Sequence, residues 1–170
     1  MHLNTIERTN RIIALVDSIE SKAAEVARGP SWPARRRPVS YYVGWYAQIL
    51  ISHLVEADGY RSFDELAVVS RYHRDAFDLR DEDEWVKAEV RSTNSPAALV
   101  PEFLIAAARH DAAVGSHLAG RMIAEIEQIC FLISDADGER SAEELRLISA
   151  VVQHLRASIG GADPDGVASG

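Results

Sequence analysis

A motif that occurs twice constrains this chain more than any other feature of its sequence. Residues 56–66 read Glu-Ala-Asp-Gly-Tyr-Arg-Ser-Phe-Asp-Glu-Leu, and residues 135–145 read Asp-Ala-Asp-Gly-Glu-Arg-Ser-Ala-Glu-Glu-Leu. Each copy follows an apolar stretch and precedes a helical pattern of apolar residues. The repeat therefore predicts two helix–turn–helix units with acidic turns, and it indicates an all-α fold.

Most of the shared residues are explained by a tight corner between two helices. In both copies the glycine is expected to end a helix in the left-handed conformation. The serine and the glutamate three residues later fit a capping box, in which each side chain accepts a hydrogen bond from the other's backbone N–H. The last leucine is expected to pack at the hinge. These positions are Gly59, Ser62, Glu65 and Leu66 in the first copy and Gly138, Ser141, Glu144 and Leu145 in the second.

The acids before each glycine are not explained by a corner alone. Glu56 and Asp58, and likewise Asp135 and Asp137, place negative charge at a helix C-terminus, which the helix dipole disfavours by ~0.3–1 kcal/mol each. An aspartate in a turn can compensate through a hydrogen bond to its own backbone. The acid two positions earlier, Glu56 or Asp135, lacks that compensation. Because both copies place an unfavourable charge at the same position, the pattern indicates a functional site.

A calcium loop of the EF-hand type offers a comparison for these acids. With the glycine at the sixth loop position, Asp135, Asp137 and Glu144 fall where calcium ligands belong, and the first copy aligns likewise. The first ligand position instead holds Ile133 or Leu54. We therefore expect weak divalent-cation binding, with calcium favoured over magnesium because irregular oxygen cages suit calcium. The candidate metal ligands are Glu56, Asp58, Glu65, Asp135, Asp137 and Glu144.

Length, charge and cysteine content narrow the class of protein. A chain of 170 residues is expected to form one domain, and its net charge of −8 argues against binding nucleic acid through phosphate contacts. The single cysteine, Cys130, excludes an intrachain disulfide and is expected to be a buried apolar residue. The uncharged stretch 38–55 is too polar for a membrane span, and the chain starts without a secretory signal pattern. The expected location is the cytoplasm.

Apolar periodicity and the breaks between periodic segments predict seven helices and no strands. Their approximate ranges are 3–28, 40–57, 63–77, a helix that opens at Asp81, 96–113, 117–133 and 142–159. Ser95 is expected to cap the fifth helix, with Pro96 at its first position and Pro101 tolerated near its first turn. The domain organisation predicted from this pattern is an N-terminal amphipathic helix with a Pro/Arg loop (1–37), a helical domain (38–159), and a flexible tail or interdomain linker (160–170).

The N-terminal segment and two smaller features leave alternatives open. The apolar stripe of the first helix must be covered, either by the rest of the bundle or by a second copy of the chain. In the loop 29–38, Trp32 and the run Arg35–Arg37 could hold an anion or an acidic partner, although a solvated linker is favoured. The aromatic cluster 41–46 is expected in the core rather than around a ligand. His110 beside Asp111 could mimic a catalytic dyad, but a surface or half-buried histidine is favoured.

The chain resembles the TerB-like family, the tellurite-resistance-associated helical domain. The residues that carry the resemblance are the two acidic turns with their serines and glutamates, together with the segment 103–112, and the likeness runs from about Gly44 to Leu155. It implies an all-α fold in which two helical hairpins pack around a pseudo-twofold axis. It also implies a cation-binding or signalling module of bacterial stress-response and phage-defence systems, where such domains are often fused to ATPase or chaperone domains. Carried over, the six acidic positions named above are the site residues, although the first copy has Glu56 where aspartate is expected.

The function expected from the sequence is therefore a non-enzymatic binding or signalling module. Its acidic turns would bind a divalent cation or a basic partner, and its partners would be another protein or a fused downstream domain such as an ATPase. Self-association through the N-terminal helix is a further expectation. The alternative is a metal-dependent hydrolase, which would need His53 or His73 as a base beside the acidic turns.

Overall fold

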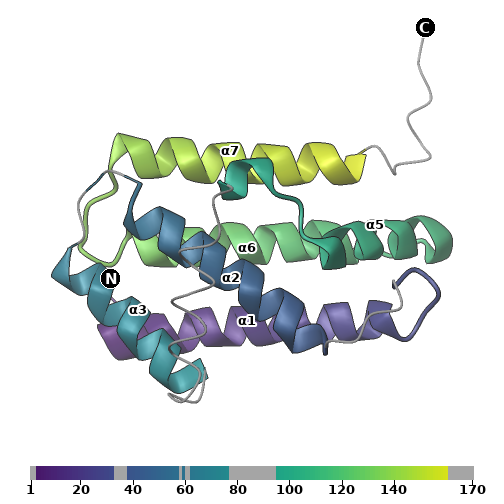
Figure 1. The fold of residues 1–170 in the computed structure, drawn as a ribbon, viewed down its shortest axis with the longest axis horizontal. Helices are drawn as coiled ribbons and strands as arrows, with labels where there is room; N and C mark the ends of the chain where they lie inside the picture. Colours follow the sequence, from purple (N-terminus) through teal and green to yellow (C-terminus); the bar gives the residue numbers. More distant parts are fainter. Residues whose placement is uncertain (1–2, 33–37, 58, 60–61, 77–94, 161–170) are drawn as a thin grey trace, which may run out of the picture.

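The computed structural model is an all-helical bundle in the residues that it describes, which are all except 1–2, 33–37, 58, 60–61, 77–94 and 161–170 (Figure 1). Those residues form six α-helices, one short 3-10 helix and no strand. The elements are α1 (Thr5–Ala27), α2 (Val39–Val55), α3 (Phe63–Ala76), η2 (Pro96–Ala98), α5 (Glu102–Val114), α6 (Leu118–Ser134) and α7 (Ala142–Gly160). The predicted all-α class is confirmed, and the helix predicted to open at Asp81 lies outside the described residues.

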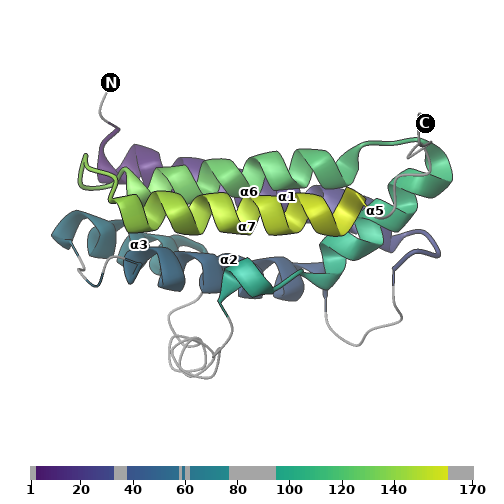
Figure 2. The same ribbon diagram turned by 90° about the horizontal axis from the view of Figure 1, so that it is seen from above.

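The helices pack around α6. This helix lies between α1 and α7, and the three run along the long axis of the molecule (Figure 1). Seen from above, α1, α6 and α7 form one layer, and α2 and α3 pack on one side of it against α1 and α6 (Figure 2). None of the described helices is both long enough and apolar enough to cross a membrane.

The N-terminal helix is part of this bundle. Asn4 caps α1 in a full capping box with Glu7, and apolar residues at helical spacing, among them Ile12, Val16 and Ile19, are buried against the other helices. α1 contacts α2, α3, α5 and α6. The prediction that its stripe packs on the bundle is confirmed.

The predicted helix 96–113 is wrong in one respect, because it is two elements. Ser95 Oγ accepts from the backbone N–H of Ala97 and Pro96 starts a helix, as expected, but that helix is the three-residue η2. Leu99 is extended, and Pro101 is the N-cap of α5 rather than a residue within it. The physical reason is Pro101, because a proline biases the residue before it away from the helical conformation.

The core holds the apolar side chains at the centre of α2, α5 and α6. The rings of Tyr46 and Phe103 meet edge to face with centroids 5.9 Å apart, and both residues are buried. Cys130 is also buried, as predicted, and burial raises the pKa of its thiol to about 12. Of the aromatic cluster expected in the core, Tyr46 is buried, but Tyr41 is 43 % exposed, so the expectation is wrong for Tyr41.

Candidate functional site

The two acidic turns lie at the same end of the bundle. One joins α2 to α3 and the other joins α6 to α7, and both stand beside the start of α1 (Figure 1). Electrostatic effects connect them, because the charges of Glu144 and Asp137 in the second copy raise the pKa of Glu65 in the first. We call this end of the molecule the acidic end, meaning residues 56–66 and 135–145.

Both turns have the same backbone geometry where they are described. The N–H of Gly59 donates to the carbonyl of Glu56 at 3.1 Å, and the N–H of Gly138 donates to that of Asp135 at 3.2 Å. The glycines have φ values of +75° and +87°, in the left-handed region that disfavours other residues. The predicted glycine-terminated corners are confirmed.

Both capping boxes are formed. Ser62 N–H donates to Glu65 Oε2 at 2.9 Å, and Glu65 N–H donates to Ser62 Oγ at 3.1 Å. The second copy repeats this with distances of 2.7 and 3.1 Å between Ser141 and Glu144. One carboxylate oxygen of each glutamate therefore accepts a hydrogen bond at the start of its own helix. Both residues are buried, with Glu65 5 % exposed and Glu144 3 % exposed.

The leucine that ends each motif does not pack as predicted. Leu66 is 40 % exposed and Leu145 is 44 % exposed, so the expectation that they pack at the hinge is wrong. In each copy the capping glutamate is the buried residue and the leucine after it faces outward. Adjacent helical residues point about 100° apart, so burying the one exposes the other.

Asp135 is compensated by an arginine of its own turn. It is the C-cap residue of α6, and both of its carboxylate oxygens accept hydrogen bonds from the Arg140 guanidinium. The guanidinium carbon also lies 4.5 Å from the centroid of the Phe131 ring. The hydrogen bond to Asp135 is the main cause of a raised pKa for Arg140. The acid that lacked an explanation in the sequence is thus held by the arginine five residues later.

The contacts of the remaining acids of the turns are described to different extents. Asp137 Oδ1 accepts from the N–H of Glu139 at 3.0 Å, which is the local turn expected for it. Glu56 is the exposed C-cap residue of α2 and has an interaction within the chain. Asp58 lies outside the described residues.

A buried arginine from α1 lies beside the acidic turns. Arg8 is only 4 % exposed, and its Nη1 donates to the carbonyl oxygen of Leu132 at 2.8 Å. Burial lowers the pKa of its guanidinium. The surrounding carboxylates raise it, in the order Asp135, Asp137 and Asp64. The chain therefore supplies its own cation to the acidic end.

Arg8 and Arg140 are the side chains at the acidic end whose contacts the sequence reasoning missed. A signal existed for each. Arg140 matches Arg61 in the repeated motif, and a residue shared by both copies needed an assignment. Arg8 stands one helical turn before Ile12, on the face of α1 that is buried, so its charge had to meet a partner inside the bundle.

The hydrogen bonds of the two capping glutamates do not fully compensate their burial. Burial is the main cause of the raised pKa of Glu65, against which the hydrogen bonds from Ser62 lower it. In the second copy, Glu144 Oε1 is buried and has no hydrogen-bond partner in the described part of the chain. Burying a carboxylate oxygen without a hydrogen-bond partner costs free energy, so this atom is an uncompensated acceptor.

Metal binding has limited support among the predicted ligands. Among the residues described, no three His, Cys, Asp or Glu side chains are grouped closely enough to hold a metal ion. Of the predicted ligands, Glu65, Asp135, Asp137 and Glu144 already accept hydrogen bonds within the chain. The buried Leu54 and Ile133 occupy the positions of the missing first ligands. Among the predicted ligands described, Glu144 Oε1 is a buried oxygen without a hydrogen-bond partner.

The dyad of His110 and Asp111 considered from the sequence has a structural explanation, because Asp111 has a different role. Asp111 accepts hydrogen bonds from the Ser116 hydroxyl and from the backbone N–H groups of Leu118 and Ala119, so it caps the start of α6 rather than orienting His110. A groove beside Asp135 is lined by residues of α1 and α6, and its lining includes no histidine. His53 is half-buried in α2, and the side chain of His73 lies outside the described residues.

Comparison of the chain with protein-family models, with curated proteins and with solved structures finds no match.

Proposed function

We propose that this chain is a non-enzymatic binding module with a TerB-like arrangement of helices, acting in a bacterial stress-response or phage-defence protein. The two hairpins α2–α3 and α6–α7, with matched turns at one end, support the arrangement. The acidic end is the proposed binding face. Its partner is a basic segment of another protein or of a fused domain such as an ATPase.

Exposed apolar side chains at the acidic end support protein docking. Phe63, the first residue of α3, is 84 % exposed, and Leu66 follows one turn later on the same helix. Leu145 occupies the place on α7 that matches Leu66. Burying such a side chain stabilises a complex by about 1.5–3 kcal/mol. A partner with an apolar side chain of its own can recover that free energy.

Charge indicates what kind of partner would be recognised. Four carboxylates are exposed in the two motifs, namely Asp64, Asp137, Glu139 and Glu143, of which Glu143 is paired with Arg146 at 3.3 Å. A basic segment would gain from this field both in its rate of association and in its selectivity. The observation that carries the proposal is the exposed Phe63 directly beside an exposed acid.

A photo-crosslinking experiment tests this proposal. Phe63 is replaced by a photoreactive phenylalanine analogue in cells of the native host, and crosslinked partners are identified by mass spectrometry. Val114, 61 % exposed at the C-terminal end of α5, provides a matched control position far from the acidic end (Figure 1). We expect position 63 to crosslink to a basic segment, with the yield reduced at high salt.

Equal crosslinking at positions 63 and 114, or crosslinks from position 63 that are insensitive to salt, would remove the support for this docking face. Phe63→Ser provides a second readout with the purified partner. Because Phe63 is exposed, the substitution should leave the fold intact while weakening binding.

Weak cation binding at the same end is a secondary candidate. Glu144 Oε1, which has no hydrogen-bond partner among the residues described, favours it. Calcium is preferred over magnesium because four of the six predicted ligands already accept hydrogen bonds within the chain, and calcium tolerates an irregular set of oxygens. A cation there would compete with a basic partner rather than support catalysis.

A further inference from the structure

The loop between α1 and α2 carries a concentration of positive charge that the proposed function does not use. It holds Arg28 and the run Arg35–Arg37, and no other part of the sequence has three basic residues in a row. Arg28 is the exposed C-cap residue of α1. The ring of Trp32 in the same loop meets Tyr42 of α2 edge to face, with centroids 6.1 Å apart. We call residues 28–38 the basic segment.

The basic segment and the acidic end belong to opposite ends of the bundle. α1 ends and α2 begins beside the basic segment, whereas α2 ends at the first acidic turn (Figure 1). The 17 residues of α2 separate the two by ~25 Å. The chain from Trp32 to Pro38 has a contour of at most ~22 Å, and it must both leave the bundle and return to it. The arginine run therefore cannot reach the acidic end of its own chain.

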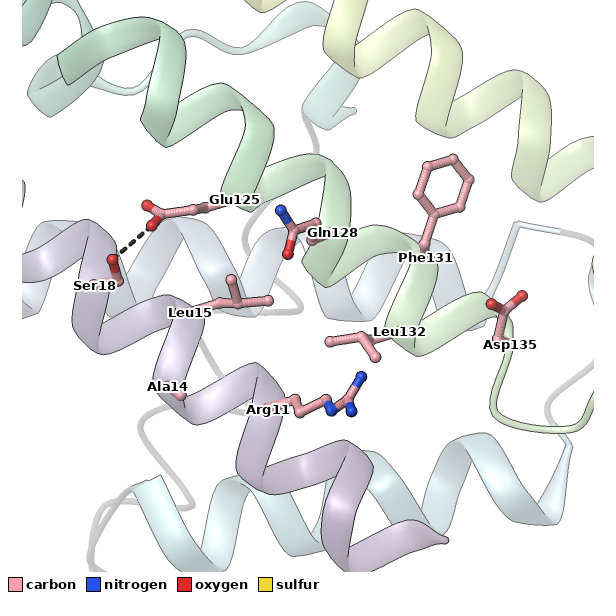
Figure 3. Close-up of a pocket in the computed structure, with 9 residues that line it drawn as sticks. All are labelled: Arg11, Ala14, Leu15, Ser18, Glu125, Gln128, Phe131, Leu132 and Asp135. Carbon is pink, nitrogen blue, oxygen red and sulfur yellow. Dashed lines mark hydrogen bonds between the residues drawn. The ribbon is translucent and has the colours of Figure 1, made fainter. Parts of the chain in front are cut away.

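The groove between α1 and α6 is not a place for these arginines, because its carboxylates are occupied. Glu125 Oε1 accepts from the Ser18 hydroxyl (Figure 3) and from Lys22 Nζ. Asp135, which also lines the groove, accepts from Arg140. The groove thus offers no free carboxylate on its rim.

The carboxylates of the acidic end, by contrast, are open. Asp64, Asp137 and Glu139 are exposed, and the ion pairs of the described residues do not involve them. Asp64 directly follows Phe63, which is 84 % exposed. An acid beside an exposed aromatic ring suits arginine in particular, because a guanidinium pairs with carboxylates and stacks on aromatic faces.

The second acidic turn shows the same chemistry within one chain. The Arg140 guanidinium is hydrogen-bonded to Asp135, and its carbon lies 4.5 Å from the centroid of the Phe131 ring. Phe63 and Asp64 present this pair of groups, aromatic ring and carboxylate, at the surface.

We propose that the basic segment of one copy of this chain docks on the acidic end of a second copy, around Phe63 and Asp64. The inference rests on the proposed function, because it names the basic partner of the same face. The contact joins two different surfaces, so a pair of molecules leaves one basic segment and one acidic end unused. Such a contact continues into short chains or closes as a ring. The net charge of −8 on each copy opposes association and keeps it weak.

Sedimentation equilibrium of the purified chain, from ~10 µM to ~1 mM, tests the contact. We expect the average mass to rise with concentration and to pass that of a dimer. Arg36→Glu should lower the association constant by about five- to tenfold, because it replaces an attraction by a repulsion. Arg156→Glu makes the same charge change on α7, where Arg156 pairs with Glu127, and should leave the association constant unchanged.

Mixing two defective variants tests whether the contact is head to tail. Arg36→Glu keeps an intact acidic end, and Phe63→Ser keeps an intact basic segment. Each alone should associate weakly, whereas an equimolar mixture should form pairs that stop at two molecules. A contact between identical surfaces would give no such recovery and would overturn the proposal.

The photoreactive analogue at position 63, used with an isotope-labelled second copy, locates the contact in the purified protein. We expect crosslinks between copies that map to residues 28–38, and none from the control position 114. A monomer at every concentration, equal effects of Arg36→Glu and Arg156→Glu, or crosslinks that map elsewhere would each overturn the proposal. If position 63 crosslinks to another basic protein in the host but not to a second copy, this inference fails while the proposed function stands. If it does neither, both fail.

Discussion

Arg8 Nη1 donates a hydrogen bond of 2.8 Å to the carbonyl oxygen of Leu132, which joins the first turns of α1 to the last turn of α6. The last carbonyls of a helix lack partners within it. Those of Phe131 and Ile133 accept from the N–H groups of Asp135 and Ala136 at the turn, and Arg8 serves the one between them. One side chain thus caps α6 and places a positive charge beside the acidic turns.

Arg8→Met is expected to destabilise the fold by about 1.5–3 kcal/mol, because it removes a hydrogen bond from a charged donor and a buried cation beside the acidic turns. Denaturant unfolding measures this. Arg11→Met, one turn along the same helix and exposed, is the matched control and should stay within about 0.5 kcal/mol of the wild type. Equal effects of the two substitutions would contradict the role given to Arg8.

Ser62→Ala and Ser141→Ala should each lower the free energy of unfolding by ~0.5–2 kcal/mol, because each removes the acceptor of a capping box. Asparagine caps helices about as well as serine, so Ser141→Asn should recover most of the loss. Unchanged denaturant midpoints in both alanine variants would mean that these hydrogen bonds do not stabilise the corners.

Glu65 is expected to make stability depend on pH. Burial raises the pKa of its carboxyl above the unfolded value of about 4.3, so the native state holds this proton more tightly than the unfolded chain does. The stabilisation is complete below the unfolded pKa and is lost as pH rises through the folded one. Glu65→Gln can keep the capping box, since glutamine also serves there. Between pH 4 and 7, the stability of the wild type relative to this variant should fall, and a constant difference would contradict the shift.

Tyr46→Phe should leave stability unchanged or raise it by up to about 1–3 kcal/mol. The Tyr46 hydroxyl is buried and has no hydrogen-bond partner in the part of the chain described. Removing it therefore removes the free-energy cost of burying a polar group without a hydrogen bond. Thermal unfolding provides the measurement, with Tyr46→Leu as the control that also removes the ring contact with Phe103. A loss of more than 1 kcal/mol in Tyr46→Phe would show that the hydroxyl is bonded.

Calcium is expected to bind in the high-micromolar to millimolar range, since four of the six predicted ligands accept hydrogen bonds within the chain. Titration calorimetry should give a small calcium heat that exceeds the magnesium heat and is lost in the double variant Asp58→Asn/Asp137→Asn. If ~10 mM calcium shifts the thermal midpoints of wild type and double variant equally, the acids are corner and docking residues only.

The corners could be predicted from the sequence because their determinants are local. A serine, a glutamate three residues later and a left-handed glycine form their hydrogen bonds within one turn, so the repeat alone predicts them. The split at Pro101 was missed because a proline is compatible with both the first turn of a helix and the position before it. Arg8 was missed because its partner is 124 residues away, and helical periodicity carries no information on which helix covers the stripe.

The pairing of α1 with α6 also sets an order of events during folding. During translation, Arg8 is synthesised long before Leu132, because 124 residues separate them. The hairpins α2–α3 and α6–α7 can each close over short connections, but α1 must wait for α6 before its buried arginine meets its partner. Contacts between segments so far apart in sequence form late and slow folding, because loop closure comes before any gain from packing. Until synthesis reaches α6, the apolar stripe of α1 stays partly uncovered, and a nascent chain halted before that point would be prone to aggregate.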